Sequence, residues 1–325
     1  MIYDYAVIGA GPAGSFMAYL LQQNGYKSIL LERRIAIDEK TCGGFLPNQG
    51  RMLLENAGIR IQELLQQDCA IIRRTIQVHA GSEKKYHCSE GYYGLGIRRQ
   101  LLDSFLLQQA RNSGADVRMN CTVQSVLHSG QIIEAAGVQA RNIIWAIGAR
   151  GITHLTDYKH DVNIQKALEK QTIGISEIIR GRTVSPQLSP DTIRFWYDDD
   201  RHGYFWVIPI GKNLWNIGYW TNQKNNTLME RFRLQKAQYV FPFLNEVETV
   251  RNPRGAFCGN SNIAAFLSGN GCGDVGGFNH WETGEGITPA FMSCAALMEK
   301  INEFEKNPLP RKFEGYYGNA HMYHR

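Results

Sequence analysis

The sequence lacks any apolar stretch that approaches the ~20 residues needed to cross a bilayer. We therefore expect no transmembrane segment, and only peripheral contact with a membrane stays open. The first residues, MIYDYAVIGAG, read directly as a strand and leave no room for a signal peptide. Long runs of Lys and Arg are also missing, so the net charge of +5 is a diffuse bias that does not indicate a nucleic-acid partner.

The sequence also lacks the patterns of metal sites and disulfide frameworks. Its seven cysteines are odd in number and widely spaced, and no two of them form a C-x-x-C pair. This spacing argues against a zinc site and against a set of disulfides. It is typical of reduced thiols, which predicts a cytoplasmic protein.

Glycine, by contrast, is abundant, because 33 of 325 residues is about a tenth, above the usual ~7%. Residues 5–8 form a short apolar run that predicts a buried parallel strand, residues 9–14 read G-A-G-P-A-G, and residues 15–24 predict a helix. A second apolar strand, 28–31, ends at Glu32. Strand, G-x-G-x-x-G, helix, strand and acidic residue in this order are a strong signature of dinucleotide binding.

Each glycine of this motif has its own physical role. Gly9 permits the tight turn, Gly11 lets the backbone touch a pyrophosphate, and Gly14 lets helix and strand pack closely. The helix N-terminus presents free N–H groups and the positive end of its dipole to the same pyrophosphate. The carboxylate of Glu32 is expected to accept hydrogen bonds from both hydroxyls of a ribose.

Two later segments favour FAD over NAD. Asp274 lies in a glycine-rich turn after the apolar stretch 264–267, so we expect it to follow a strand and to bind the ribityl chain of a flavin. Residues 283–287, T-G-E-G-I, open a predicted helix that extends to about Phe304. The N–H groups at its start would face the N1/O2 edge of the flavin ring and stabilise the negative charge of the reduced form.

Further motifs lie between these two ends. The segment 142–151 predicts an apolar strand that ends in I-G-A-R-G, and residues 42–44 read C-G-G. Residues 99–103, R-Q-L-L-D, open a predicted helix to about residue 111. The run 204–209 reads Y-F-W-V-I-P and is followed, eight residues later, by G-Y-W at 218–220.

Together these motifs resemble the FAD-dependent reductases and monooxygenases of the para-hydroxybenzoate hydroxylase type, and within them most of all the geranylgeranyl reductases. The resemblance implies an enzyme that transfers hydride through flavin N5 to or from a largely apolar, isoprenoid-like small molecule, with NAD(P)H or another electron donor reducing the FAD. An FAD-dependent monooxygenase acting on an aromatic or other small molecule is the alternative. A non-catalytic flavin-binding protein is the third interpretation.

One stretch departs from the family. Relatives usually read G-F-x-N-P-x-T-G-E-G before the last helix, but here His280 replaces the Asn and Trp281 replaces the Pro. In relatives that Pro lies beside the reactive edge of the flavin, so a bulky indole implies a differently shaped pocket. The chain also ends earlier than typical geranylgeranyl reductases. Both differences weaken the isoprenoid prediction and leave the FAD prediction intact.

The predicted fold class is α/β, with a Rossmann-like FAD-binding domain and an inserted antiparallel β-sheet domain for the substrate. Residues 1–68, 95–153 and 255–325 are assigned to the FAD-binding domain, and 69–94 and 154–254 to the substrate-binding domain. Short turns make neighbouring antiparallel strands of the segments 192–197, 204–209 and 214–219.

The predicted site residues fall into two binding groups. Those expected to hold FAD are Gly9, Gly11, Ala13, Gly14, Glu32, Arg33, Cys42, Gly43, Arg99, Gly148, Asp274, Gly284, Glu285, Gly286 and Ile287. Those expected to contact the substrate are Tyr204, Trp206, Pro209, Trp220 and Trp281, with Phe195 as a further wall. Ordinary core packing explains an aromatic stripe on a strand equally well.

A reductase also needs a proton donor, and two residues are candidates. The thiol of Cys42, with an ordinary pKa of about 8.5, would be mostly protonated at neutral pH, although a small buried residue in a glycine turn is an equal alternative. His280 titrates near neutrality, although it could instead bind a backbone carbonyl. Glu285 is expected to stay ionised at a helix N-terminus and to play no chemical part.

Overall fold

The chain begins with the predicted strand, glycine loop, helix and strand. The computed structural model describes residues 1–304 except 90, 92, 159, 201, 224–226, 260–261, 268–269 and 281–282. Strand β1 (Ile2–Ile8) is followed by helix α1 (Pro12–Gln23) and strand β2 (Ser28–Leu31). Because β1 and β2 pair in parallel, with Tyr5 opposite Ser28, the expected β-α-β unit is present.

The first sheet has the strand order β8-β2-β1-β11-β10-β9, with β17 paired to β11. Its remaining strands are β8 (Asp116–Arg118), β9 (Val126–Ser129), β10 (Ile132–Ala135), β11 (Val138–Trp145) and β17 (Asn270–Gly271). β11 lies parallel to β1, so the carboxyl ends of these strands meet at one edge of the sheet. The glycine loop after Ile8 and the turn after Trp145 therefore lie side by side, and Ala146 N donates to Ile8 O.

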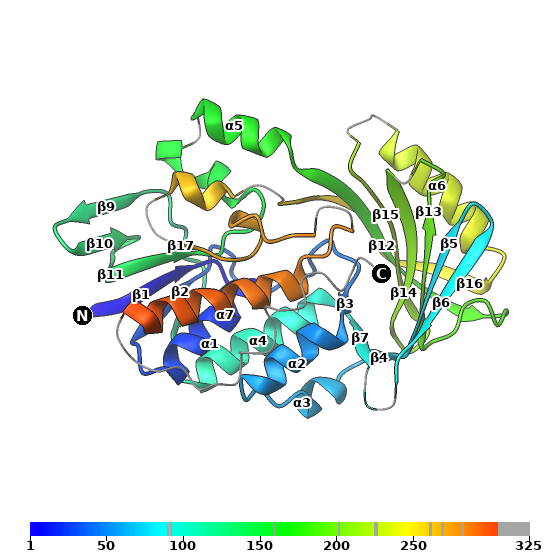
Figure 1. Ribbon diagram of the computed structural model, residues 1–325, viewed down its shortest axis with the longest axis horizontal. Helices are drawn as coiled ribbons and strands as arrows, with labels where there is room; N and C mark the ends of the chain where they lie inside the picture. The colour runs from blue at the N-terminus through cyan, green and yellow to red at the C-terminus, as the bar shows by residue number, and fades with distance from the viewer. Residues whose placement is uncertain are drawn as a thin grey trace.

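Helices cover both faces of this sheet (Figure 1). On one face lie α1, α2 (Asn48–Asn56), α3 (Gln62–Leu65), α4 (Arg99–Asn112) and α7 (Ile287–Phe304). The Phe16 ring of α1 meets the Phe291 ring of α7 edge to face, with centroids 5.2 Å apart, and both rings are fully buried. On the other face lie α5 (Val162–Glu169), η1 (Gly151–His154) and η2 (Thr156–Tyr158).

Asp274 follows a strand, as expected, but the apolar stretch 264–267 does not form it. The apolar stretch 264–267 lies mostly within the short helix η3 (Ile263–Phe266), because the side chain of Asn262 accepts from Ala265 N and favours a turn. The strand that leads to Asp274 is the two-residue β17, which is followed at once by η4 (Gly273–Val275). Asp274 nevertheless lies at the carboxyl edge of the first sheet, since β17 pairs in parallel with the end of β11.

The second sheet has the strand order β16-β12-β15-β14-β13-β5-β6. Its strands are β5 (Arg74–His79), β6 (Ser82–His87), β12 (Thr172–Thr183), β13 (Thr192–Tyr197), β14 (Gly203–Gly211), β15 (Leu214–Thr221) and β16 (Leu244–Cys258). The three predicted strands are confirmed and are antiparallel neighbours, whereas β13 and β5 pair in parallel. The α/β class with a Rossmann-like layer and a second β-sheet is thus confirmed.

Alternate residues of the second sheet face opposite sides, as the pleat requires. On β14, Trp206 and Ile208 belong to the apolar cluster that faces the first layer. Phe205 and Val207 belong to a different cluster, which packs under helix α6 (Leu228–Tyr239) through Phe232. A small sheet of β3 (Phe45–Leu46), β7 (Gly94–Ile97) and β4 (Cys69–Ile72) lies between the two layers.

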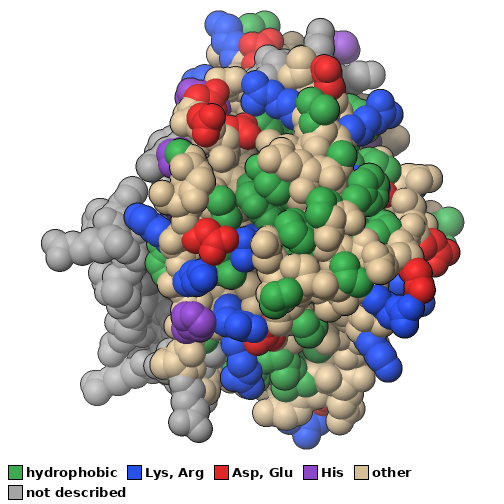
Figure 2. Space-filling view, turned by 90° about the vertical axis from the view of Figure 1, so that its right-hand side faces the viewer, with side chains coloured by type: hydrophobic (Ala, Val, Ile, Leu, Met, Phe, Trp, Pro, Cys, Tyr) green, Lys and Arg blue, Asp and Glu red, His purple; other side chains and the backbone are tan. Residues whose placement is uncertain are grey.

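The outward side of the second sheet carries both hydrophobic and charged side chains. Figure 2 shows hydrophobic side chains across the middle of this side of the molecule and charged ones towards its margins. In the described ranges, no helix is both long and apolar enough to cross a membrane. Peripheral membrane contact stays a prediction.

Candidate active site

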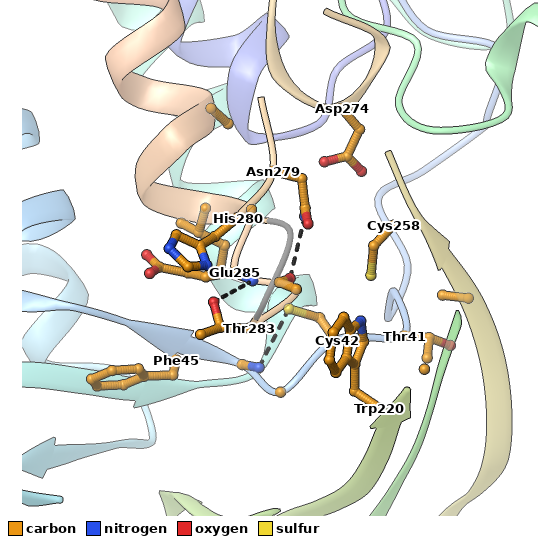
Figure 3. Close-up of a pocket in the computed structure, with 18 of the residues that line it drawn as sticks. Thr41, Cys42, Phe45, Trp220, Cys258, Asp274, Asn279, His280, Thr283 and Glu285 are labelled. Carbon is orange, nitrogen blue, oxygen red and sulfur yellow. Dashed lines mark hydrogen bonds between the residues drawn. The ribbon is translucent and has the colours of Figure 1, made fainter. Parts of the chain in front are cut away.

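A cavity of about 400 Å³ lies between the two layers (Figure 3). Its first wall comes from the loops at the carboxyl edge of the first sheet, including Gly11, Gly148 and Asp274. Its second wall comes from the inward face of the second sheet. The cavity therefore joins the segments expected to bind a flavin with those expected to contact a substrate.

The glycine loop shows why its three glycines differ. Gly9 has φ +102°, and a Cβ there would lie 2.6 Å from Ala146 O, so a side chain is excluded by both conformation and contact. A Cβ on Gly14 would overlap the carbonyl of Gly9, which confirms close packing of loop and helix. A Cβ on Gly11 meets nothing within 4 Å, because Gly11 borders the cavity. No side chain caps the N-terminus of α1 at Gly11, which leaves this end available to an anion.

Glu32 and Arg33 do not line the cavity. The buried carboxylate of Glu32 accepts from Ala10 N at 2.7 Å and from Arg34 Nε at 2.8 Å, so it fastens the glycine loop to the end of β2. Burial alone would raise the pKa of Glu32. The hydrogen bonds lower this pKa by more than burial raises it, so the net shift is downward. Arg33 is exposed and contacts His154 Nε2 at 3.0 Å. Their roles with a ribose or a phosphate stay predictions.

Arg99 is buried and lines the cavity. It forms a two-pronged ion pair with Asp103 one helical turn later, Nε to Oδ1 and Nη2 to Oδ2, both at 2.8 Å. Burial lowers the pKa of Arg99, but Asp103 and the nearby Cys42 raise it more, so the guanidinium stays charged. The Arg99–Asp103 ion pair thus lies beside Cys42.

Asp274 faces the cavity from the turn after β17 (Figure 3). Burial raises the pKa of Asp274 above its usual range, although Lys40, Arg99 and Asn279 oppose the shift. A buried polar group gains from a hydrogen-bonding ligand, and a carboxylate that faces a cavity suits ribityl hydroxyls. Gly148 adds an open stretch of backbone nearby, with φ +73°.

The start of α7 forms the next part of the wall. His280 N donates to Glu285 O and Gly284 N donates to His280 O, both at 2.8 Å, so the backbone of His280 is fastened to that of Gly284 and Glu285. Gly284 has φ +66°, and a Cβ there would lie 2.7 Å from Trp220 Nε1. Gly286 and Ile287 also line the cavity.

The expectation that the start of α7 holds Glu285 ionised stays a prediction, and burial of the side chain opposes it. Burial raises the pKa of Glu285, and this effect exceeds the lowering by Thr288 at the start of the helix. His280 and Glu285 lie on the α7 side of the cavity, while Cys42 lies towards the second sheet (Figure 3).

The aromatic wall comes from the inward face of the second sheet. Tyr204, Trp206, Trp220 and Phe195 line the cavity, as predicted, but Pro209 does not. Pro209 lies three residues after Trp206 on β14, so the pleat places its side chain on the opposite face of the sheet. Ile208 lines the cavity instead. Trp281 lies outside the described residues.

The polar atoms of three aromatic side chains in this wall form hydrogen bonds within the protein. Tyr204 donates to the carbonyl of Thr283, Trp206 Nε1 donates to Asn216 Oδ1 at 2.9 Å, and Trp220 Nε1 donates to Thr172 Oγ1 at 3.1 Å. Burial raises the pKa of Tyr204 well above its usual value, so the phenol stays neutral. The surface that these rings offer the cavity is thus mainly apolar.

Sequence reasoning missed several cavity residues. Thr75 and Gln77 lie two residues apart on β5, so both face the cavity with neutral polar side chains. β5 lies towards one edge of the second sheet, and β16 forms the other edge. Lys40 adds a cation, and Asn216 contacts the Cys42 loop without lining the cavity. Period-two alternation could have found Asn216, which lies two residues before Gly218 of the recognised motif, but only the paired strands show what its amide meets.

Three cysteines line the cavity, Cys42, Cys258 and Cys272, and the seven cysteines are all free. Cys42 lies in the loop after β2, and Cys258 ends β16 on the opposite wall. Burial, together with the nearby Asp274, raises the pKa of Cys258 to about 12. No group of three or more metal-ligating side chains gathers anywhere in the described ranges.

The shifted pKa of Cys258 predicts slow alkylation. Because the thiolate is the nucleophile, its reaction with iodoacetamide should keep rising about tenfold per pH unit above pH 9, towards pH 12. Exposed Cys88 provides the comparison within the same sample. Peptide mass spectrometry across a pH series measures both rates, and a Cys258 rate that levels off near pH 9 would contradict the shift.

Comparisons with known proteins agree with this geometry. The family model described as FAD binding domain matches residues 3–240. A digeranylgeranylglycerophospholipid reductase of Methanocaldococcus jannaschii is 24% identical over 70% of this chain and 58% of its own length. Similar curated reductases are likewise covered over little more than half of their length, 54% and 59%.

Solved structures share the fold. A geranylgeranyl bacteriochlorophyll reductase-like protein of Thermoplasma acidophilum superposes with a TM-score of 0.76 at 18% identity, over 99% of this chain and 84% of the other. A probable FAD-dependent monooxygenase of Pseudomonas aeruginosa superposes with a TM-score of 0.70 at 16% identity, over 98% and 92%. The similarity to geranylgeranyl reductases and to the wider monooxygenase group that the motifs indicated is thereby confirmed.

Proposed function

Because the chain belongs to the FAD binding domain family, we propose that it is an FAD-dependent oxidoreductase, a reductase or dehydrogenase of a largely apolar small molecule. One observation carries the proposal: a single cavity is bounded by the glycine loop and α7 on one side and by an aromatic sheet on the other. The reductase is preferred because the chain is similar to archaeal digeranylgeranylglycerophospholipid reductases over about 70% of its length.

The residues of the first layer suit FAD. The uncapped start of α1 with Gly11 would hold the pyrophosphate, Asp274 the ribityl chain, and the start of α7 the N1/O2 edge of the ring. Bound FAD supplies a hydride at N5. NAD(P)H or another electron donor would reduce it.

The protein's own chemical task is then to supply a proton. Reduction of a carbon–carbon double bond adds a hydride to one carbon and a proton to the other. Cys42 and His280 both line the cavity and both can carry a proton. We propose Cys42 as the donor, because its thiol lines the cavity beside the buried Arg99, with which it interacts. His280 is the second candidate.

The charge of the cavity supports an uncharged substrate. Its described charged residues, Lys40, Arg99, Asp274 and Glu285, all belong to the first layer. The described side chains from the second sheet are apolar or neutral, with Thr75 and Gln77 as polar contacts. Since a diphosphate placed against the second sheet would lose its hydration and meet no cation on that wall, geranylgeraniol should bind at least about tenfold more tightly than geranylgeranyl diphosphate. Perturbation of the flavin absorption spectrum measures both affinities.

Product analysis tests the reaction itself. The FAD-loaded protein is reduced under anaerobic conditions and mixed with geranylgeraniol, and the product is examined by mass spectrometry. Gain of two hydrogens supports the reductase. A product that gains one oxygen atom, and only when air is admitted, would establish the monooxygenase alternative. The seven free cysteines support a reducing compartment such as the cytoplasm for this activity.

A further inference from the structure

The Asn216 amide connects the second sheet to the Cys42 loop. Asn216 lies on β15 with only 3% of its surface exposed. Its Nδ2 donates to the carbonyl of Cys42 at 2.7 Å, and its Oδ1 accepts from Trp206 Nε1 at 2.9 Å. An indole N–H only donates and a carbonyl only accepts, so the amide has one favourable orientation.

The indole of Trp206 is held between two glycines. A Cβ on Gly218 of β15 would lie 2.5 Å from Trp206 Cε2, so the ring lies directly over this position. A Cβ on Gly43 would lie 3.7 Å from Trp206 Nε1, so the Cys42 loop packs against the ring from another side. Trp206 therefore fills the space between β15 and the Cys42 loop.

Contacts other than those of Asn216 and Trp206 also hold the Cys42 loop. Gly44 has φ +72°, a Cβ there would lie 2.5 Å from Ile97 O, and Gly44 N donates to Cys42 Sγ at 3.5 Å. From β16, Arg251 Nη2 donates to Glu39 O at 3.3 Å and to Thr41 Oγ1 at 3.2 Å. The second sheet thus holds this loop from two strands, with the thiol facing the cavity.

We propose that Asn216 is a positioning residue that fixes the Cys42 thiol in the cavity and ties it to the Trp206 wall. The proposal rests on the proposed function, in which Cys42 donates the proton. Asn216 does not line the cavity, so its effect on a reaction there would pass through Cys42 and Trp206. A substitution at Asn216 should therefore change the behaviour of the thiol while FAD still binds.

Thiol alkylation tests the positioning without any substrate. Asn216→Leu keeps the branched shape and removes both hydrogen bonds, whereas Asn216→Asp keeps the acceptor for Trp206. We expect the iodoacetamide rate at Cys42, located by peptide mass spectrometry of the FAD-loaded protein, to rise about fivefold in Asn216→Leu, the factor that loss of the one hydrogen bond to the Cys42 carbonyl gives. A rise is also expected in Asn216→Asp, because a carboxylate cannot donate to the Cys42 carbonyl, and this variant serves if Asn216→Leu does not fold.

Asn222→Leu is the matched control. Asn222 lies just beyond the end of β15, is exposed, and its Oδ1 contacts His202 Nδ1 at 3.2 Å. Its substitution should leave the Cys42 rate unchanged. Equal Cys42 rates in the wild type and in the folded Asn216 variants would overturn the proposal, as would an equal rise in Asn222→Leu.

A double-mutant cycle then tests whether the effect on turnover passes through Cys42. With geranylgeraniol as the substrate, Asn216→Asp should slow turnover when it is the only substitution. Added to Cys42→Ser, it should cause little further loss. Independent, additive losses would overturn the proposal. If wild-type protein does not turn over geranylgeraniol, the proposed function fails for this substrate, while the alkylation rates still decide the positioning role.

Discussion

Gly11→Val is expected to abolish FAD binding while the protein stays folded. Gly11 has φ −74° and an extended ψ, which valine also adopts, and an added Cβ meets no protein atom within 4 Å. The added side chain would instead occupy the part of the cavity in which the pyrophosphate approaches the start of α1. We expect the Kd for FAD to rise at least about 100-fold, equivalent to about 2.7 kcal/mol.

The measurement pairs an FAD titration with thermal unfolding of the FAD-free protein. Gly14→Val provides the contrast, since a Cβ at Gly14 would overlap the carbonyl of Gly9 and should lower the unfolding temperature strongly. Gly11→Val should leave that temperature near the wild-type value. Wild-type affinity for FAD in Gly11→Val would show that the cofactor does not approach this loop.

Cys42→Ser is expected to slow reoxidation of the reduced flavin by the substrate by about 10²- to 10⁴-fold, the range that a positioned general acid contributes. A serine hydroxyl is a far weaker acid than a thiol, whereas its size is similar, so FAD should still bind.

His280→Gln is measured beside it, because His280 lines the same cavity. Stopped-flow absorbance of the reduced, FAD-loaded variants with geranylgeraniol gives both rates. A large loss in His280→Gln alone would move the proton donor to His280. Wild-type rates in both variants would remove both residues as donors.

Local features of the fold could be predicted from the sequence. The strand, loop and helix of residues 2–23 could be predicted from an apolar run and from the spacing of the glycines. That spacing is set by contacts within the same segment, such as that between Gly9 and Gly14. The strands β13, β14 and β15 were predicted because short turns join them. In both cases the determining interactions are close in sequence.

Features that depend on distant pairing were missed. The strand before Asp274 is only two residues long and exists because it pairs with β11, about 125 residues earlier in the chain. Pro209 belonged to a recognised motif, but the pleat of β14 turns it away from the cavity. Asn216 gave no motif signal, since its partner Cys42 lies 174 residues away.

Uptake of FAD tests the central claim most directly. The purified protein, stripped of bound cofactor and titrated with FAD, should bind one FAD per chain and show the flavin absorption near about 450 nm. Addition of geranylgeraniol should then perturb that absorption, because the aromatic wall and the flavin site share one cavity. A folded protein that takes up no FAD would contradict the account.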